Sequence, residues 1–487
     1  MEKPEEYFLR VKKLEEIRKN GINPYPYFFD IDAKIEEIKS NYQDFENKDV
    51  KVAGRLKAVR DFGKALFADL LGEIDWIQIY LKKDSIGEEK FNFFKKYIDI
   101  GDIIGISGKV MKSRTGEITI FVNDYTLLTK SLLPLPEKYH GLRDKEKRYR
   151  QRYLDFIVNE KAKEILLKRR EIIDSIREFL NKNGFVEFET PILQPIYGGA
   201  TARPFITYAN ALDTKLYLRI SNELYLKRLI VGGFERVYEF SKDFRNEGID
   251  RTHYPEFTLL EGYIAYKDYF FLMDFIEKLF TFLIDKVFKN EKIEFDGKEI
   301  SFKTPFKRIY FLDSLSEILG VEIKKENEEK IREKGIEKGI YEVKNLPYHK
   351  MIDKLFDELI GRNLWEPTFV CDHPIEISPL AKRHREKEGC VERFELFIAG
   401  IEIVNAFSEL NDPIDQRKRF EEELKYKDLG DEEAHVIDED FLTALEVGMP
   451  PTAGFGIGID RLCMILLNAE NIREVISFPQ LRPKHET

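Results

Sequence analysis

Charged and aromatic side chains recur at every second position between Val237 and Tyr266. Before a loop at residues 248–254 they are Asp243, Arg245 and Glu247, and after it they are Phe257, Glu261 and Tyr263. Alternate side chains of a strand share a face, so two antiparallel strands joined by this loop would gather them on one surface, with His253 at the loop end. A charged row beside an aromatic ring is costly to bury and has no evident use if it is merely exposed. The segment therefore indicates a functional surface; a polar solvent face of an antiparallel sheet is the alternative.

A hairpin with its turn at Gly400 is predicted between residues 393 and 413. Strict alternation places three of its side chains on one face: Asn405, Phe407 and Glu409. Glu402 is out of phase with them and reaches the same face only if a β-bulge intervenes. Glu395 and Glu402 flank the turn, and oxygen ligands without histidine or cysteine suit Mg²⁺ bridged to substrate phosphates rather than zinc. Paired glutamates on a solvated hairpin are the alternative.

A glycine-rich strand precedes an apolar helix near the end of the chain. Its glycines are Gly448, Gly454, Gly456 and Gly458, and Asp460 and Arg461 open the helix. The segment lacks both the GK[ST] of a P-loop and the GxGxxG of a dinucleotide fold, so the glycines alone are weak evidence for a nucleotide. They could equally permit close packing of a helix on a strand. Arg461 favours a phosphate site, because guanidinium is the preferred clamp for phosphate oxygens.

The hydrophobic pattern predicts the elements of the first third of the chain. Apolar residues at helical spacing indicate an amphipathic helix at residues 5–20. Period-two alternation at 50–52, 77–81, 104–106 and 118–122 then predicts short strands of a small β-barrel, of which the oligonucleotide-binding barrel is one form. Pro134 and Pro136 indicate a linker, because proline fits neither a sheet ladder nor a helix interior.

Longer elements are predicted further along. Residues 161–183 read as a long helix that runs into a strand, and Pro191 ends that strand or places it at a sheet edge. A helical block follows from Tyr269. The run at 322–338 is so rich in lysine and glutamate that we expect a solvated insertion or plain surface helix.

Composition excludes several classes of protein. The chain has 487 residues, enough for roughly three domains of ~150 residues, with 43% hydrophobic and 34% charged residues. A net charge of −10 argues against indiscriminate coating of nucleic acid, so such a partner must meet a local patch. The basic run at 138–152 is either that patch or a solvated linker. Neither a signal peptide nor a membrane span is evident, and three scattered cysteines suggest neither disulfides nor a zinc site, so we expect a cytoplasmic protein.

In order, these segments resemble the motifs of the class II aminoacyl-tRNA synthetases, and in detail those of the lysyl-tRNA synthetases. The likeness covers nearly the whole chain: VAGR at Val52, YRQRYLD at Tyr149, GGATARPFITYANALD at Gly198, FRNEG at Phe244, SPLAKRH at Ser378 and GIGIDR at Gly456. Each motif alone is modest, but the ordered set is highly specific.

The resemblance implies an α+β protein with an N-terminal OB-fold β-barrel and a catalytic domain built on an antiparallel sheet flanked by helices. The expected domains are 1–135 for the N-terminal helix and anticodon-binding barrel, 136–160 for a basic linker, and 161–487 for the catalytic domain, with a charged helical insertion around 320–350. The implied activity is ATP-dependent activation of L-lysine and its transfer to tRNA(Lys), with Mg²⁺. Homodimers would form through the segment GFVEFETP at residues 184–191.

The resemblance also implies roles for single residues. The ATP-binding residues would be Arg245, Glu247, His253, Phe257 and Arg461, with Arg245 and Arg461 as the catalytic arginines. Glu395 and Glu402 would ligate Mg²⁺. Lysine would be bound by Gly199, Glu223, Glu261, Tyr263, Asn405, Phe407 and Glu409, with the side-chain ammonium at Tyr263 and Glu409. In the barrel, Arg60 and Phe67 would stack on anticodon bases, and Gln78 and Glu117 would read base edges. A core position is the alternative for Phe67.

Three positions depart from the family pattern. Tyr254 stands where asparagine is common, which puts a loop contact to the nucleotide in question. Ala406 stands where many members have glycine, and we expect it to narrow the amino-acid pocket slightly. Gly262 replaces a bulkier apolar residue.

Other functions remain to be weighed against this one. A synthetase for aspartate or asparagine would share the barrel and ATP motifs, but an acidic substrate calls for an arginine where this chain has Glu409 and Tyr263. The enzyme that lysylates elongation factor P resembles the catalytic domain alone, and the barrel argues against it. A non-enzymatic RNA-binding paralogue would not need Arg245, Glu395, Glu402 and Arg461.

Overall fold

A computed structural model describes residues 3–136, 142, 144–428 and 436–483 of the chain. It divides into two compact units, Met1–Glu164 with Gln480–Thr487, and Ile165–Pro479. The expected linker falls partly on residues 137–141 and 143, which lie outside the described residues. Among the described residues, none of the helices has the length and apolarity of a membrane span.

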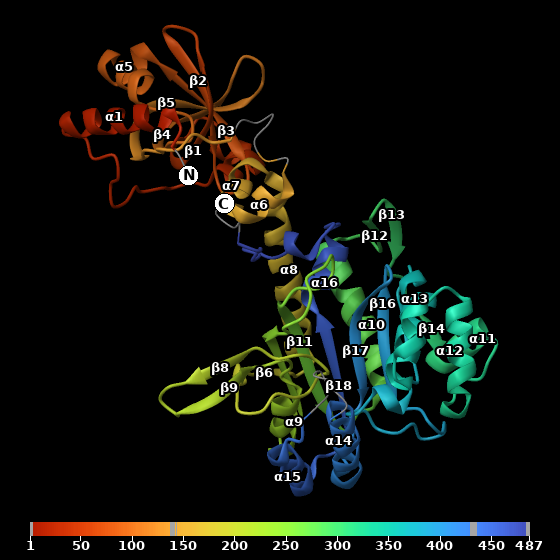
Figure 1. Cartoon of the computed structure of the whole chain (residues 1–487). Coiled ribbons are helices and arrows are strands. Elements are labelled where there is room, and N and C mark those ends of the chain that lie inside the picture. The colour runs from red at the N-terminus through yellow and green to blue at the C-terminus, as the bar shows by residue number, and fades with distance from the viewer. Residues whose placement is uncertain (1–2, 137–141, 143, 429–435, 484–487) are drawn as a thin grey trace. The chain divides into compact units, whose positions relative to one another are not determined.

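The first unit is a closed five-stranded barrel preceded by a helix (Figure 1). The expected helix is α1, Glu5–Lys19, and the barrel order is β1-β2-β3-β5-β4. The strands are β1 Asp49–Asp61, β2 Ala65–Leu71, β3 Trp76–Lys82, β4 Ile103–Lys112 and β5 Ile118–Thr129. Alternation sends Val50, Val52, Ile77 and Ile79 into the barrel interior, as expected, where they are at most 4% exposed. Strand β2 was not predicted, although Leu66, Ala68 and Leu70 alternate in the sequence and are buried in the barrel interior.

Short helices complete this unit. They are α2 Ile35–Ser40, α3 Tyr42–Phe45, α4 Lys83–Ile86, α5 Glu88–Tyr97, α6 Lys145–Arg150 and α7 Arg152–Val158. The last two occupy part of the basic run, where Arg148 and Arg152 pair with the buried carboxylate of Asp155. Part of the run's positive charge is therefore neutralised within the fold.

The second unit is built on an eight-stranded sheet of order β14-β15-β16-β17-β18-β11-β10-β6. Only its two outermost pairs, β14 with β15 and β10 with β6, are parallel. The strands are β6 Val186–Glu187, β10 Arg236–Phe244, β11 Glu256–Ala265, β14 Lys307–Tyr310, β15 Thr368–Cys371, β16 Arg393–Ile398, β17 Ile401–Ser408 and β18 Thr452–Gly458. The two strands expected around the loop at 248–254 are β10 and β11, and they pair antiparallel.

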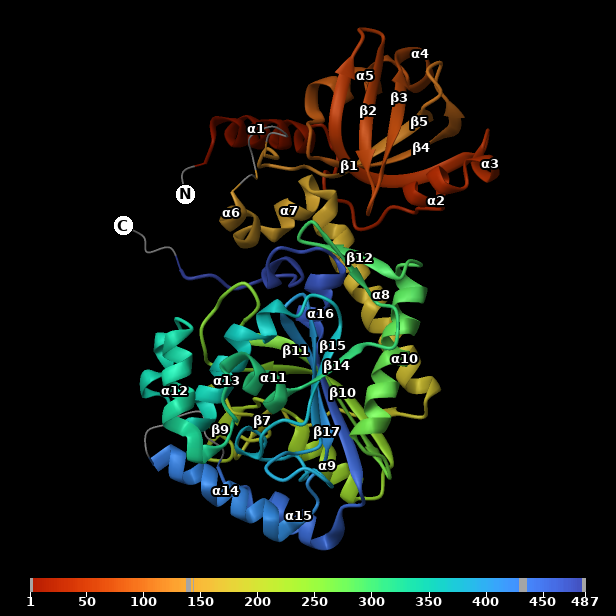
Figure 2. The ribbon, with the colours of Figure 1, turned by 90° about the vertical axis from the view of Figure 1, so that its right-hand side faces the viewer.

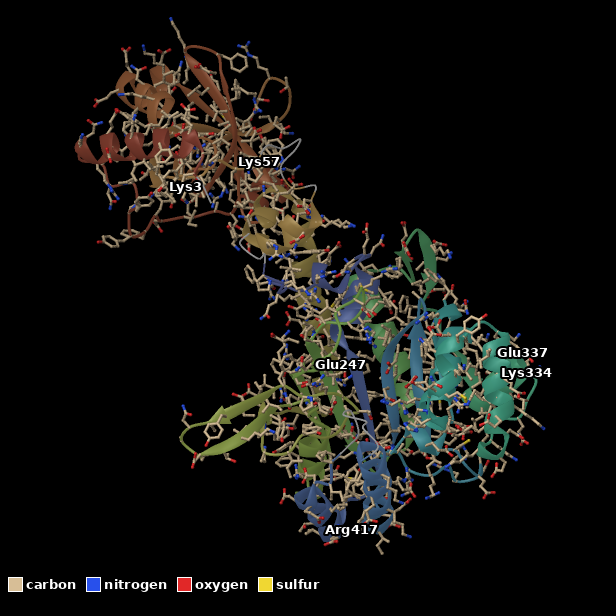
Figure 3. The ribbon with its side chains drawn as sticks, viewed as in Figure 1. Lys3, Lys57, Glu247, Lys334, Glu337 and Arg417 are labelled. Atoms are coloured by element: carbon tan, nitrogen blue, oxygen red, sulfur yellow. The ribbon has the colours of Figure 1, made fainter. Side chains whose placement is uncertain are left out.

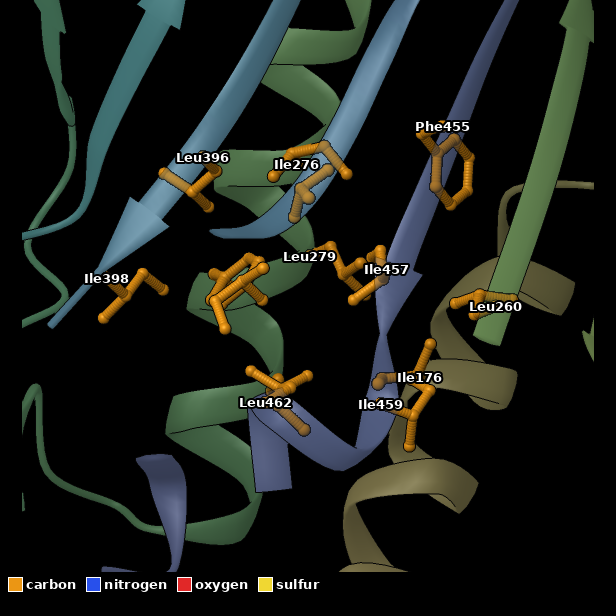
Figure 4. Close-up of a cluster of buried hydrophobic side chains, with 14 of the residues drawn as sticks. Ile176, Leu260, Ile276, Leu279, Leu396, Ile398, Phe455, Ile457, Ile459 and Leu462 are labelled. Atoms are coloured by element: carbon orange, nitrogen blue, oxygen red, sulfur yellow. The ribbon is translucent and has the colours of Figure 1, made fainter. Parts of the chain in front are cut away.

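Three helices cover one face of this sheet. They are α8 Glu160–Lys182, α10 Tyr269–Val287 and α16 Ile459–Leu466, and α10 runs along the sheet in Figure 2. Ile276 and Leu279 of α10 meet Phe455 and Ile457 of β18 in the main apolar cluster (Figure 4). Burial of each such side chain contributes about 1.5–3 kcal/mol. Since this face is the core, the opposite face of the same strands is left for other chemistry.

Smaller elements flank the main sheet. They are β7 Leu193–Gln194, β8 Ile206–Ala209 and β9 Thr214–Leu218 in one small sheet, β12 Lys292–Phe295 and β13 Lys298–Ser301 in another, and the helices α9 Glu223–Val231, α14 Pro413–Asp428 and α15 Glu439–Gly448. Leu226 and Ile230 of α9 pack with Phe420 and Phe441 in an apolar cluster of their own.

The charged stretch expected as a solvated insertion is only partly solvated. It forms α12, Glu328–Glu337, which packs with α11 Phe311–Leu319 and α13 Tyr348–Leu359 around a separate apolar cluster. Ile331 is fully buried there, while Lys334 and Glu337 pair with each other at 2.7 Å on the outer side (Figure 3). The run is a surface helix, but one of its faces is core.

The segment 184–193 forms much less strand than expected. Only Val186–Glu187 pairs with the main sheet, and Leu193–Gln194 pairs with β9 instead. Pro191 interrupts the ladder between them, because proline lacks the N–H that a ladder needs.

Candidate active site

Two glycines of β18 lie in the middle of the sheet face opposite the main core, and we call the strip above them, between the side chains of β11 and β17, the trough. Gly456 of β18 lies between Asn405 of β17 and Glu261 of β11, and Gly454 lies between Phe407 and Tyr263 in the next row. Directly opposite residues of antiparallel strands present their side chains on the same face. The face predicted for the strand with Glu261 and Tyr263 and the face predicted for the strand with Asn405 and Phe407 therefore form a single surface.

Glu409 closes one end of the trough. Its backbone N–H donates to Thr452 O at 2.8 Å. Glu409 therefore continues the row of β17 side chains, Asn405 and Phe407, by one more position. A Cβ at Gly454 would collide with Glu409 Oε1 and lie 2.5 Å from the Tyr263 ring, so only glycine leaves room for both side chains. Burial raises the pKa of Glu409 to about 8, and the nearby charge of Glu223 adds to the rise while Lys227 opposes it.

Lys227 of α9 pairs with Glu409 inside the pocket. Its ammonium also lies 2.5 Å from Glu223 Oε1, one helical turn away on the same helix. Burial alone would lower the pKa of Lys227, but the two carboxylates outweigh burial and raise it. The side chain is fully buried and charged between Glu223 and Glu409.

Glu261 is held by two hydroxyl groups. Ser221 Oγ donates to its Oε1 at 2.9 Å, and the Tyr263 hydroxyl donates to its Oε2 at 3.3 Å. Burial and the charges of Asp243 and Glu223 raise its pKa well above the usual range. Several neighbouring buried carboxyl groups with raised pKa values mark a site that a cationic ligand would stabilise.

Gly199 approaches this cluster closely. Its φ of +84° belongs to the left-handed region, and a Cβ there would lie 2.8 Å from Ser221 Oγ and 3.1 Å from Glu223 Cβ. Both the backbone angle and the lack of space require glycine. The expected grouping of Gly199, Glu223 and Glu261 is present.

Arg245 and Phe257 lie at the other end of the trough. The Arg245 guanidinium lies over the Phe257 ring, 5.0 Å from its centre, and Phe257 pairs with Asp243 across the strands. The expectation that Glu247 continues the strand face of Asp243 and Arg245 is wrong. Strand β10 ends at Phe244, and Arg245 O accepts from the Glu247 N–H in a turn, which leaves Glu247 exposed beside the loop (Figure 3).

Arg461 joins that loop to the hairpin. Its Nη2 lies 2.8 Å from His253 Nε2, and its Nη1 donates to Glu402 O at 3.1 Å and pairs with Glu402 Oε2 at 3.4 Å. The neighbouring Asp460 accepts from Thr258 N at 2.7 Å and pairs with Arg169 at 2.5 Å. These contacts of Asp460 fix the start of α16. The fixed helix start in turn positions the Arg461 side chain beside the trough.

The β-bulge required for Glu402 is present. Leu396 opposes Val404 and Phe397 opposes Glu402, so Ile403 is the extra residue that brings Glu402 round. Burial raises the pKa of Glu395 to about 8, Arg393 opposes the rise, and Glu402 and Asp353 add to it. Arg393 does not fully offset burial and these neighbouring carboxylates, so a divalent cation would stabilise the charged form of Glu395.

Glu395 and Glu402 offer carboxylate oxygens, the donor type that Mg²⁺ prefers. Arg393 holds Glu395 Oε1 at 2.5 Å and donates to Asn405 Oδ1 at 2.9 Å. Over the described part of the chain, no group of three or more acidic, histidine or cysteine side chains converges as a metal site. Glu395 and Glu402 would therefore share the ion with substrate oxygens.

The outer face of the barrel carries a row of aromatic rings. Phe67, Tyr80 and Phe121 stand side by side on three strands, with ring centres 4.7 and 5.1 Å apart, and Arg60 opposes Phe67. The core alternative for Phe67 is wrong, since the ring lies half-buried outside the barrel's apolar cluster.

The polar barrel candidates lie beside these rings. Gln78 occupies the next row on the same face, and Thr119 Oγ1 donates to its Oε1 at 3.0 Å. Glu117 is exposed one residue before β5 begins. Arg60 is held by Asp69 through two hydrogen bonds of 2.6 and 3.1 Å.

Two of the departures from the family pattern lie away from the trough. Ala406 and Gly262 both oppose Phe455, whose ring belongs to the main core, and Ala406 is fully buried there. The expectation that Ala406 narrows the amino-acid pocket is wrong, because adjacent strand residues point to opposite faces. A Cβ at Gly262 would lie 2.5 Å from the Phe455 ring, so the large ring and the glycine compensate each other. Tyr254 is also buried in the main core.

Sequence reasoning missed Lys227, Arg393 and Asp353. Lys227 follows Glu223 by one helical turn, and Arg393 precedes Glu395 by two residues on the same strand face. These spacings were signals that could have found them. Asp353 had none, since α13 reaches the hairpin only through the tertiary fold.

The family described as tRNA synthetases class II (D, K and N) matches residues 144–482, and the family described as OB-fold nucleic acid binding domain matches residues 50–128. The sheet, its glycine-floored trough and the barrel thus belong to a class II tRNA synthetase.

Relatives narrow this class further. The chain is 53% identical to the lysine–tRNA ligase of Thermoanaerobacter pseudethanolicus, over 98% of this chain and 96% of that protein. It is 51% identical to the lysine–tRNA ligase of Thermotoga maritima, over 98% and 95% of the two chains, and 53% identical to that of Aquifex aeolicus, over 93% and 76%. The chain belongs to the lysine–tRNA ligase family.

Proposed function

We propose that this protein activates L-lysine with ATP to lysyl-adenylate and transfers the lysyl group to tRNA(Lys). One observation carries the proposal. Along a single face of the sheet, Arg245 and Phe257 come first, Glu261 and Asn405 follow, and Tyr263 and Glu409 come last. This order matches a nucleotide, an amino-acid head group and a cationic side chain placed end to end.

At the nucleotide end, Phe257 stacks on adenine and Arg245 holds the α-phosphate together with the lysine carboxylate. Arg461 engages the terminal phosphate, supported by His253, and Glu247 contacts the nucleotide from the loop. The Arg245 guanidinium lies over the Phe257 ring, so the proposed phosphate and adenine contacts adjoin each other.

At the amino-acid end, Glu223, Glu261 and the Gly199 backbone receive the α-ammonium, and Asn405 receives the carboxylate. Phe407 lines the pocket, and Tyr263 and Glu409 take the side-chain ammonium. A neutral side chain would leave Glu409 only the Lys227 ammonium, which it shares with Glu223, and leaving a buried charge without its partner costs up to about 3–5 kcal/mol. This energy amounts to a selectivity of roughly two to three powers of ten.

The chemistry needs no protein nucleophile. The lysine carboxylate oxygen attacks the α-phosphorus in line, the bond to pyrophosphate breaks, and the pyrophosphate leaves with that electron pair. Positioning and charge neutralisation by Arg245 and Arg461 supply most of the rate. Mg²⁺ held by Glu395 and Glu402 would neutralise phosphate charge when bound.

The barrel reads the anticodon. Arg60 and Phe67 stack on unpaired bases, extended by Tyr80 and Phe121 in the same row, and Gln78 and Glu117 read base edges. Two further proposals concern the whole protein: it works in the cytoplasm, and it forms a homodimer through residues 184–191. Apolar side chains exposed near that segment support the dimer, with Val186 at 50% and Leu193 at 49%.

ATP–pyrophosphate exchange with each of the twenty amino acids tests the proposal directly. We expect exchange with lysine, and at least about 100-fold less with every other amino acid. Exchange driven by aspartate or asparagine would identify a different synthetase. No exchange with any amino acid would favour a non-enzymatic RNA-binding role.

A further inference from the structure

Lys227 is a buried cation inside the anionic pocket. Its side chain is fully buried, and its Nζ lies 2.5 Å from Glu223 Oε1 and forms an ion pair with Glu409 Oε2. The rings of Phe407 and Phe441 flank the ammonium at 5.6 and 5.8 Å from their centres. Taking an ammonium out of water costs several kcal/mol. A lysine at this position must therefore provide an interaction that a neutral residue could not.

Lys227 contacts one carboxylate from each of the two groups of residues proposed to bind the substrate, the group at the α-ammonium and the group at the side-chain ammonium. The Cβ of Glu223 borders Gly199 and its backbone N–H donates to Ser221 Oγ, so the base of this side chain lies beside the proposed site for the α-ammonium. Glu409 borders Tyr263 and Gly454, beside the site for the side-chain ammonium. One ammonium that touches a single oxygen of each carboxylate holds the two groups at a fixed separation. Glu409 Oε1 and the second oxygen of Glu223 are left for a ligand.

We propose that Lys227 is a positioning residue that ties these two carboxylates together and so sets the chain length of the diamino acid that the pocket accepts. This inference rests on the proposed function. A substrate whose two ammonium groups match the fixed separation reaches both carboxylates. Ornithine, one methylene shorter, reaches only one of them while Lys227 holds both in place.

A purely structural ion pair is the competing explanation, and the chain offers a matched control for it. Lys130 is equally buried and pairs with two carboxylates, Asp99 and Asp102, in the barrel unit. Removing either lysine strands buried carboxylates and lowers stability. Only loss of Lys227 changes which amino acid is chosen, because only Glu223 and Glu409 line the lysine pocket.

The test compares full-length wild type, Lys227→Met and Lys130→Met in ATP–pyrophosphate exchange with lysine and with ornithine. A fixed pocket distinguishes one methylene by roughly 10- to 200-fold in kcat/KM. For Lys227→Met we expect at least a tenfold loss of the lysine-to-ornithine ratio and a raised KM for lysine, with the KM for ATP within about twofold of wild type. For Lys130→Met we expect a lower melting temperature and an unchanged ratio.

An unchanged lysine-to-ornithine ratio in folded Lys227→Met would overturn the proposal, and so would an equal change of the ratio in Lys130→Met. If Lys227→Met does not fold, Lys227→Arg decides, because it keeps the charge but alters the reach. A wild-type ratio in that variant also overturns the proposal. Failure of wild type to exchange with lysine would instead reject the proposed function.

Discussion

Arg461 Nη2 lies 2.8 Å from His253 Nε2. Since guanidinium only donates, His253 Nε2 accepts, and the proton is on Nδ1, which lies 2.8 Å from Asp250 Oδ2. Asp250, His253 and Arg461 thus form a chain of hydrogen bonds that runs from the loop to the first turn of α16. The loop and the proposed phosphate clamp are positioned by the same contact.

Replacing His253 with phenylalanine should weaken ATP binding. The substitution removes the acceptor of a charged hydrogen bond, which contributes about 1.5–3 kcal/mol, so we expect the KM for ATP to rise at least tenfold. The KM for lysine should stay within about twofold, because His253 is far along the trough from Glu409. Steady-state exchange kinetics with each substrate varied in turn measure both, and an equal rise in both constants would argue for general disruption.

Replacing Glu409 with glutamine should abolish lysine-dependent exchange. The amide keeps the shape but loses the charge that faces the ammonium, so we expect a loss of at least about 100-fold in kcat/KM for lysine. ATP binding, measured by calorimetry, should be largely retained. Unchanged exchange kinetics would remove Glu409 from the proposed site.

Replacing Gly454 with alanine should damage the lysine pocket while the sheet stays intact. The new Cβ would collide with Glu409 Oε1 and crowd the Tyr263 ring. Gly456→Ala is the matched control on the same strand, because its nearest atom, Glu261 Cγ, would lie 3.8 Å away. We expect the KM for lysine to rise more in Gly454→Ala than in Gly456→Ala. The reverse order would contradict the proposed place of the side-chain ammonium.

Lysine binding should depend on pH below about 8. Burial raises the pKa of Glu409 to about 8, so the empty site holds a proton at lower pH, and the substrate ammonium must displace it. The affinity for lysine should therefore fall as pH decreases below about 8, and binding near pH 7 should release protons. Calorimetry in buffers of different ionisation enthalpy measures the release, which should decrease in Glu409→Gln. Affinity that rises towards acid pH has the wrong sign for this mechanism.

Replacing Phe67 with alanine should weaken tRNA charging but not adenylate formation. Base stacking on an aromatic side chain contributes about 1–3 kcal/mol, so the KM for tRNA should rise about tenfold or more. Pyrophosphate exchange serves as the internal control because it does not involve tRNA. If charging and exchange fall together, Phe67 supports the barrel's fold rather than anticodon binding.

Local sequence periodicity determined much of the fold. Period-two alternation predicted which residues of β10, β11 and β17 share a face, because the pleat is a property of each strand alone. The mismatch between Glu402 and Asn405 even required the bulge that Ile403 provides. The helices at 5–20 and 161–183 were equally clear from their apolar spacing.

The family motifs in the sequence indicated which residues to consider together, but not how they contact one another. The tertiary structure alone brought Lys227 to Glu409, joined Arg461 to His253, and put Ala406 in the core rather than in the pocket. It also lined up Phe67 with Tyr80 and Phe121 on the barrel. Such contacts depend on the order of strands and the docking of helices, which are set by long-range packing that no local spacing encodes.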